Sequence, residues 1–172
     1  MSEAIDANQQ KATVTAHQIN ISVAQQLANL VKSTLGPYGM DKEMVDAAGK
    51  VVMTNDGATI LKETNLKHPT ATIITEIART QEENCYDGTT SSVVINGELM
   101  KKASLLLDKN IHPTRIAKGF NLANNKAQEL LEEIAIEADE SILLQVAKTA
   151  MTGKSVESDD SVLAQICVEV TN

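Results

Sequence analysis

Aromatic residues are almost absent from this sequence, which has no tryptophan, two tyrosines and one phenylalanine among its 172 residues. A core built by this chain must therefore be aliphatic. Few aromatic rings also leave little surface on which the bases of single-stranded nucleic acid stack. The net charge of -8 points the same way, because a phosphate backbone is bound by basic surfaces. The composition argues against a nucleic-acid partner.

Cysteine and histidine are also scarce, with two and three residues. Cys85 and Cys167 lie far apart and form no CxxC pair, so we expect reduced thiols and neither a disulfide nor a zinc site. No apolar run approaches the length of a membrane span, and residues 1–10 lack the apolar core of a signal peptide. We expect a cytoplasmic protein with no membrane partner.

Apolar residues at helical spacing predict a mainly α-helical fold. One stripe over residues 23–31 is stopped by Gly36-Pro37. The triplet His-Pro-Thr occurs at residues 68–70 and 112–114, and each copy puts proline where the first turn of a helix tolerates it. The second copy leads into the clearest amphipathic stripe of the chain, which ends at Ile134.

The remaining segments are short. Residues 44–45 and 51–53 flank a small-residue turn and predict a β-hairpin. A short helix carrying Ile60 and Leu61 is expected to follow. The last apolar helix, with Leu163 and Val170, has no stop signal, and we interpret this abrupt end as a cut.

Three loops rich in Gly, Asp and Thr adjoin predicted helices. The strongest is residues 87–92, Asp-Gly-Thr-Thr-Ser-Ser. A helix N-terminus offers free N–H groups to phosphate, Gly88 permits a close approach, and Asp87 is an oxygen ligand of the kind Mg²⁺ uses beside phosphate. The alternative is that Asp87 is simply an N-cap.

The other two loops are weaker signals taken singly. Residues 35–42 read Leu-Gly-Pro-Tyr-Gly-Met-Asp-Lys, a turn that either lies against a nucleotide or only stops a helix. Residues 54–59 read Thr-Asn-Asp-Gly-Ala-Thr, in which Asp56 is either an N-cap or a carboxylate aimed at a substrate water.

Together, the segments "VKSTLGPYGMDK", "VVMTNDGATILKE", "DGTTSSVV", "GELMKKA" and "NIHPTRI" resemble the group II chaperonins, the family of the archaeal thermosome and the eukaryotic cytosolic ring. No P-loop GxxxxGK[ST] occurs. The resemblance implies an equatorial-domain-like helical bundle with a small hairpin. It assigns residues 1–140 to the nucleotide-binding equatorial domain and residues 141–172 to the start of the intermediate domain.

The resemblance also implies roles for single residues in binding ATP and Mg²⁺. Asp87 would hold the metal, and Asp56 would help to position the attacking water as the catalytic residue. The nucleotide-binding set comprises Leu35, Gly36 and Pro37, of which Gly36 and Pro37 lie on the base and ribose side, Gly88, Thr89, Thr90 and Ser91 on the phosphates, and Lys154 as a sensor of the γ-phosphate.

Two departures from the family pattern stand out. Tyr86 replaces a glycine that usually precedes Asp87, and its side chain is expected to tighten or partly block the approach to the metal. The N-terminus lacks the apolar strand that, in the family, pairs with the hairpin of a neighbouring subunit.

Family members are also longer, with an apical domain that binds unfolded client proteins and return segments that complete the ATPase site. We therefore expect a chaperone segment that binds ATP, joins other chaperonin subunits and hydrolyses ATP only in the complete subunit. The alternative is an interaction module that keeps the fold without turnover. A helical phosphotransferase is disfavoured, because its motifs are missing.

Overall fold

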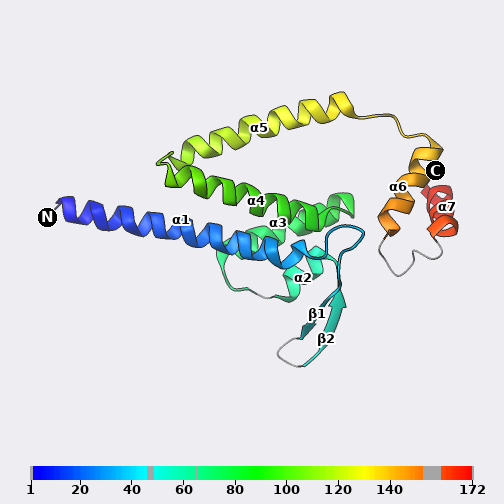
Figure 1. Ribbon diagram of the computed structural model, residues 1–172, viewed down its shortest axis with the longest axis horizontal. Coiled ribbons are helices and arrows are strands. Elements are labelled where there is room, and N and C mark those ends of the chain that lie inside the picture. The colour runs from blue at the N-terminus through cyan, green and yellow to red at the C-terminus, as the bar shows by residue number, and fades with distance from the viewer. Residues whose placement is uncertain (1, 46–48, 65, 153–159, 172) are drawn as a thin grey trace. The chain divides into compact units, whose positions relative to one another are not determined.

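The computed structural model describes residues 2–45, 49–64, 66–152 and 160–171, with side chains from Ala16 onward. The helices in the described part are α1 (Ser2–Lys32), α2 (Gly57–Glu63), α3 (Pro69–Cys85), α4 (Thr89–Asp108), α5 (Pro113–Ile134), α6 (Glu140–Met151) and α7 (Asp160–Thr171) (Figure 1). The strands are β1 (Lys42–Val45) and β2 (Val51–Thr54). This order confirms the mainly α fold with one hairpin.

The predicted helix starts are confirmed at both His-Pro-Thr triplets. Pro69 and Pro113 are the first residues of α3 and α5. His68 adds a cap that the proline pattern did not predict, because its Nδ1 accepts a hydrogen bond from Thr70 N–H at 3.2 Å. At the N-terminus, α1 extends back to Ser2.

The chain divides into two compact units. One contains residues 1–35 and 39–113, and the other contains residues 36–38 and 114–172. The division falls within the segment predicted to be equatorial, and the proposed boundary between family domains at residue 140 remains a prediction.

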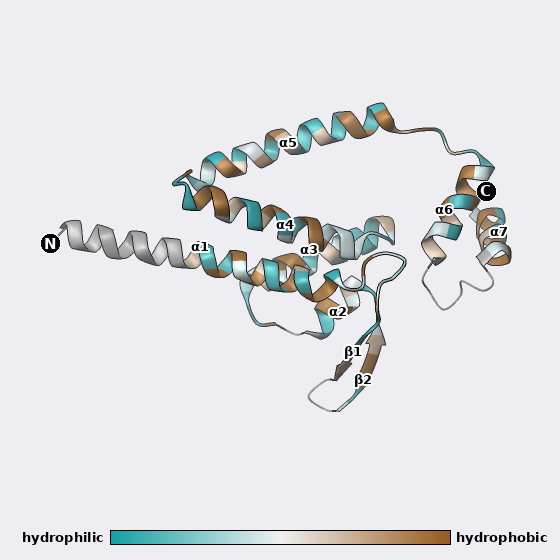
Figure 2. Cartoon of the chain, viewed as in Figure 1, coloured by the Kyte–Doolittle hydropathy of each residue, from teal (hydrophilic) through white to brown (hydrophobic). Residues whose placement is uncertain are grey.

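The core of the first unit is aliphatic, as the composition requires. Apolar bands on α1, α3 and α4 are visible in Figure 2. The buried cluster contains Ala24, Leu27, Ala28, Val31, Ala58, Ile60, Leu61, Ala71, Ile74, Ala78 and Val93. Since these residues come from α1 to α4, burying them fixes the short helix α2 between longer ones.

The packing of α1 on α4 depends on Gly97. A methyl group at this position would overlap the Ala28 methyl, so only glycine permits the two helices to approach so closely. An exposed ion pair joins the same helices, with Lys32 Nζ 3.4 Å from Glu98 Oε1. The close contact between helices, more than this exposed pair, fixes the position of α4 and hence of its N-terminus.

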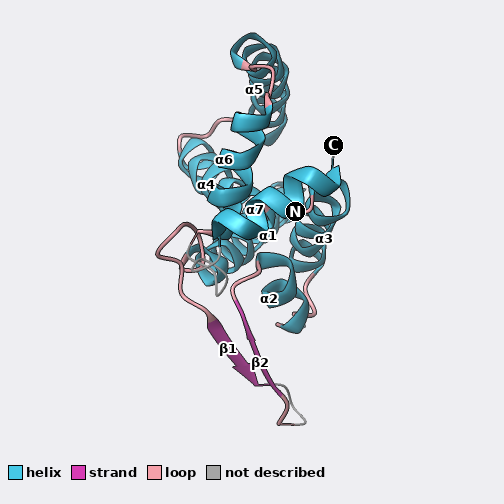
Figure 3. Cartoon of the chain, turned by 90° about the vertical axis from the view of Figure 1, so that its right-hand side faces the viewer, coloured by secondary structure: helices cyan, strands magenta, loops and turns pink. Residues whose placement is uncertain are grey.

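The two strands form an antiparallel hairpin in which Lys42 pairs with Thr54 and Val45 with Val51. Figure 3 shows the strands running alongside each other away from α2. Because β2 ends at Thr54, the hairpin leads directly into the loop that carries Asp56.

The second unit contains most of α5 together with α6 and α7. Asp139 caps α6 by accepting a hydrogen bond from Ile142 N–H at 2.8 Å, and α6 packs against α7. The stripe predicted on α5 is largely exposed: Leu130 shows 45% of its surface to solvent and Ile134 shows 70%. The helical spacing of apolar residues identified an apolar face on α5, but this spacing does not show what covers that face.

Candidate functional site

Asp56 caps the N-terminus of α2. Its Oδ2 accepts a hydrogen bond from Thr59 N–H at 2.7 Å, and its own backbone N–H donates to Thr54 Oγ1 at 3.1 Å. The N-cap interpretation is therefore confirmed. The other carboxylate oxygen, Oδ1, accepts a hydrogen bond from the Thr89 hydroxyl at 3.1 Å.

The surroundings of Asp56 favour its charged form. Partial burial raises the pKa of this carboxyl, but hydrogen bonds from Thr59, Thr89 and Ala58 outweigh burial and hold the pKa below its ordinary value. The Asp56 side chain is consequently a charged carboxylate at neutral pH, which accepts hydrogen bonds and has no proton to donate.

The Asp56 and Asp87 loops meet at their glycines and threonines. A Cβ atom on Gly57 would lie 2.6 Å from Thr90 Oγ1 and 3.0 Å from the Thr90 backbone nitrogen. Glycine at position 57 therefore lets the first turn of α2 touch the first turn of α4. The structure thus brings together two loops that the sequence placed more than thirty residues apart, with Thr89 buried at their junction.

The N-terminus of α4 has no side-chain cap. Its N-cap residue is Gly88, in the left-handed conformation with φ of 79°, and glycine has no side chain to accept a hydrogen bond from the first turn. The alternative interpretation of Asp87 as the N-cap is therefore wrong. A glycine can adopt this conformation without steric penalty, and it takes the cap position that Asp87 would otherwise occupy.

Asp87 lies just before this helix and is exposed. Its Oδ1 accepts a hydrogen bond from Gly88 N–H at 2.7 Å. The Gln81 side chain donates to the Asp87 carbonyl oxygen at 2.9 Å and so supports the loop from α3. Our sequence analysis missed Gln81, because nothing in its spacing distinguishes it from other polar residues on the outer face of a helix.

Tyr86 ends α3 in the left-handed conformation, with φ of 55°. A glycine adopts such a φ easily, which accounts physically for the usual family residue, whereas tyrosine is strained there. Tyr86 is 87% exposed. The expectation that its side chain tightens or partly blocks the approach to the metal stays a prediction.

The remaining predicted site residues are less closely connected. Leu35 belongs to the first unit, whereas Gly36, with φ of 87°, and Pro37 belong to the second. Their place on the base and ribose side of a nucleotide therefore stays a prediction. Lys154 lies outside the described residues.

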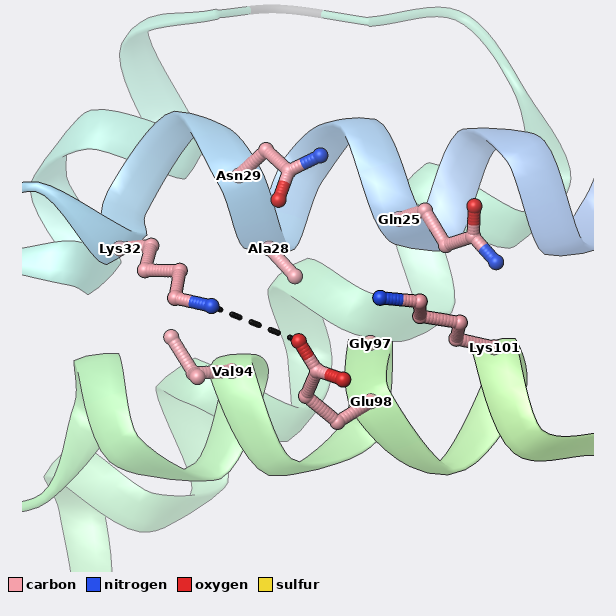
Figure 4. A pocket seen from close by; sticks show the side chains of 8 residues that line it. All are labelled: Gln25, Ala28, Asn29, Lys32, Val94, Gly97, Glu98 and Lys101. Carbon is pink, nitrogen blue, oxygen red and sulfur yellow. Dashed lines mark hydrogen bonds and ion pairs between the residues drawn. The ribbon is translucent and has the colours of Figure 1, made fainter.

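A hollow of about 100 Å³ lies between α1 and α4, lined by residues that include Gln25, Lys32, Glu98 and Lys101 (Figure 4). The side chains of Lys32 and Glu98 point toward each other across it. It shares no residue with the predicted nucleotide site, and its small size and exposed ion pair give it no evident chemistry.

Among the residues that the structure describes, no group of three or more His, Cys, Asp and Glu side chains gathers to hold a metal ion. Mg²⁺ bound beside phosphate takes one or two carboxylates and completes its coordination with phosphate and water. Asp87, exposed next to an uncapped helix N-terminus, fits that requirement. No helix of the described chain is long and apolar enough to cross a membrane.

Comparison with known proteins identifies the family of the chain. Residues 27–172 match the model of the TCP-1/cpn60 chaperonin family. The chain belongs to this family. It is 52% identical to a thermosome subunit from Pyrococcus horikoshii and to one from Methanopyrus kandleri, in each case over 157 residues, 90% of this chain and 29% of the relative.

The thermosome subunit alpha of Archaeoglobus fulgidus is equally similar, with 52% identity over 157 residues. These matches confirm the resemblance to group II chaperonins. The chaperonin chain spans about 29% of the length of the curated relatives that it matches.

Proposed function

We propose that this chain is the ATP-binding segment of a group II chaperone that assists protein folding, with the nucleotide phosphates held at the N-terminus of α4. The observation that carries the proposal is the uncapped first turn of α4 behind Gly88. Free N–H groups at a helix N-terminus bind phosphate, and the helix dipole favours negative charge there.

The side chains around that turn have complementary roles. Gly88 lets a phosphate approach the backbone, and the hydroxyls of Thr90 and Ser91 donate hydrogen bonds to its oxygens. Asp87 would hold Mg²⁺, which neutralises phosphate charge when bound. The family resemblance assigns Leu35, Gly36 and Pro37 to nucleotide binding, with Gly36 and Pro37 on the base and ribose side, and assigns Lys154 to sensing the γ-phosphate.

Asp56 serves as the residue that orients the attacking water. A carboxylate suits this task because it accepts a hydrogen bond from water, and the lowered pKa keeps it charged. Hydrolysis belongs to the complete subunit, where a second carboxylate and an adenine-side loop join the site. Assembly with other chaperonin subunits and client binding through an apical domain are part of the same proposal.

Thermal melting with Mg-ADP tests the phosphate site. A ligand that binds only the folded state raises the melting temperature. We expect Mg-ADP to do so for the unmodified chain and for the control Asp108→Ala, which removes an exposed carboxylate from the other end of α4. We expect Asp87→Ala to abolish the magnesium-dependent part of the shift while it preserves helix content.

Two results would contradict this proposal. If Mg-ADP leaves the melting temperature of the unmodified chain unchanged, the chain is an interaction module that keeps the fold without nucleotide. If Asp87→Ala melts with the same Mg-ADP shift as Asp108→Ala, the metal role of Asp87 is wrong.

A further inference from the structure

The hydrogen bond between Thr89 and Asp56 uses the single hydroxyl proton of Thr89. The Thr89 hydroxyl donates to Asp56 Oδ1 at 3.1 Å, and Thr59 N–H donates to Oδ2 at 2.7 Å. Each carboxylate oxygen thus has a donor. A hydroxyl has only one proton to donate, so the Thr89 hydroxyl cannot donate at the same time to Asp56 and to a phosphate oxygen.

Burial makes this competition consequential. Thr89 exposes only 8% of its surface, so few water molecules reach its hydroxyl. Thr89 is also the first residue of α4, where the proposed phosphate binds. A phosphate that takes the Thr89 proton leaves Asp56 Oδ1 without its donor. Because an unpaired carboxylate oxygen is unfavourable, that oxygen then recruits another donor.

We propose that Thr89 is a positioning residue whose hydroxyl donates to Asp56 Oδ1 when no nucleotide is bound and to a nucleotide phosphate when one is bound, so that the attacking water replaces Thr89 as the donor to Oδ1. This inference rests on the proposed nucleotide site. One O–H···O hydrogen bond replaces another, and no covalent bond changes. Asp56 Oδ1 loses its Thr89 donor only when a phosphate is present.

The exchange predicts that Asp56 opposes nucleotide binding through Thr89. Asp56→Asn keeps an oxygen that caps α2, because asparagine is an equally good N-cap. Its amide group can face Thr89 as a donor, which leaves the Thr89 proton to the phosphate. Removal of a negative charge also favours phosphate binding, but that general effect does not need Thr89.

A double-mutant cycle separates the two effects, with Mg-ADP affinity measured by calorimetry. The unmodified 172-residue chain is compared with Asp56→Asn, Thr89→Val and the double variant. We expect Thr89→Val to weaken binding about tenfold, as for loss of a hydrogen bond to a charged group. Thr89→Ser, which keeps the hydroxyl, should stay within about twofold of the unmodified chain.

The decisive comparison is the effect of Asp56→Asn in the two backgrounds. We expect it to tighten Mg-ADP binding at least about threefold more when Thr89 is present than in the Thr89→Val background. An equal factor in both backgrounds overturns the inference while it leaves the nucleotide site standing. No binding by the unmodified chain overturns the proposed function and this inference together.

If Thr89→Val fails to fold, an NMR measurement on the unmodified chain still tests the inference. The carboxyl carbon of Asp56 should shift in the NMR spectrum in step with saturation by Mg-ADP, while that of the exposed Asp108 at the other end of α4 stays unchanged. Saturable binding with an unmoved Asp56 signal overturns the exchange of partners.

Discussion

The two carboxylate oxygens of Asp56 contact different helices. Oδ2 caps α2, and Oδ1 accepts a hydrogen bond from Thr89 at the start of α4. Because the pKa of folded Asp56 lies below the ordinary value of 3.8, the unfolded chain takes up this proton first as the pH falls. The resulting stabilisation is complete above about pH 5 and is lost as the pH falls through 3.8 and then through the folded pKa.

This linkage gives a prediction for Asp56→Asn, which retains the cap. At pH 7 the free energy of unfolding should fall by about 1 kcal/mol, because the charged acceptor of the Thr89 hydroxyl is lost. In acid below the folded pKa of Asp56, the two chains should be equally stable. Urea titrations across this range check the prediction. A deficit that persists unchanged in acid would show that the substitution acts through packing alone.

At the residue scale, the sequence identified the chemistry but not the contacts. Asp56 and Thr89 were both predicted site residues, but 33 positions separate them, and only tertiary packing shows that they share a hydrogen bond. The N-cap interpretation failed for Asp87, because it depends on the φ of Gly88. Composition and local spacing do not determine that angle.

At the scale of elements, helix starts and the hairpin were predictable because proline, turn residues and apolar period act locally. The approach of α1 to α4 was not. It depends on Gly97 meeting Ala28, two small residues far apart in the chain. A glycine inside a helix signals some packing or functional need, but it does not name the partner.

We therefore predict that two glycine-to-alanine substitutions in helices differ in their effect on the stability of the chain. Gly97→Ala should destabilise the chain by about 1–2 kcal/mol, since overpacking against Ala28 exceeds the gain in helix propensity. Gly119→Ala, in α5 with no neighbouring atom within 4 Å of the new methyl group, should not destabilise it. Circular-dichroism melts compare the two. An equally stable Gly97→Ala chain would contradict the close packing of α1 on α4.

At the scale of the whole molecule, the chain spans 29% of its Pyrococcus horikoshii relative. Orienting reactants correctly supplies several kcal/mol of a catalytic barrier, so a site lacking some of its groups is slower by orders of magnitude. We predict that the purified 172-residue chain binds Mg-ATP weakly and shows no steady-state ATPase by phosphate release. Robust hydrolysis that disappears with Asp87→Ala would contradict this prediction.

The family could be predicted because several loop motifs occur in one order, and the helical architecture could be predicted from the spacing of apolar residues. The division into compact units could not, because it depends on which helices contact each other. The exposed stripe of α5 illustrates this limit, since Leu130 and Ile134 have the period of a buried face and remain exposed.

The most direct test of the account is to observe the first turn of α4 during a titration with Mg-ADP. Backbone amide signals of Gly88, Thr89, Thr90 and Ser91 should shift together and saturably in the NMR spectrum, while those of α7 remain in place. Chelation of magnesium should reverse most of the change, because Asp87 acts through the metal. Saturable shifts centred on other residues, or no saturable shift at any soluble Mg-ADP concentration, would contradict the claim that this helix N-terminus holds the nucleotide phosphates.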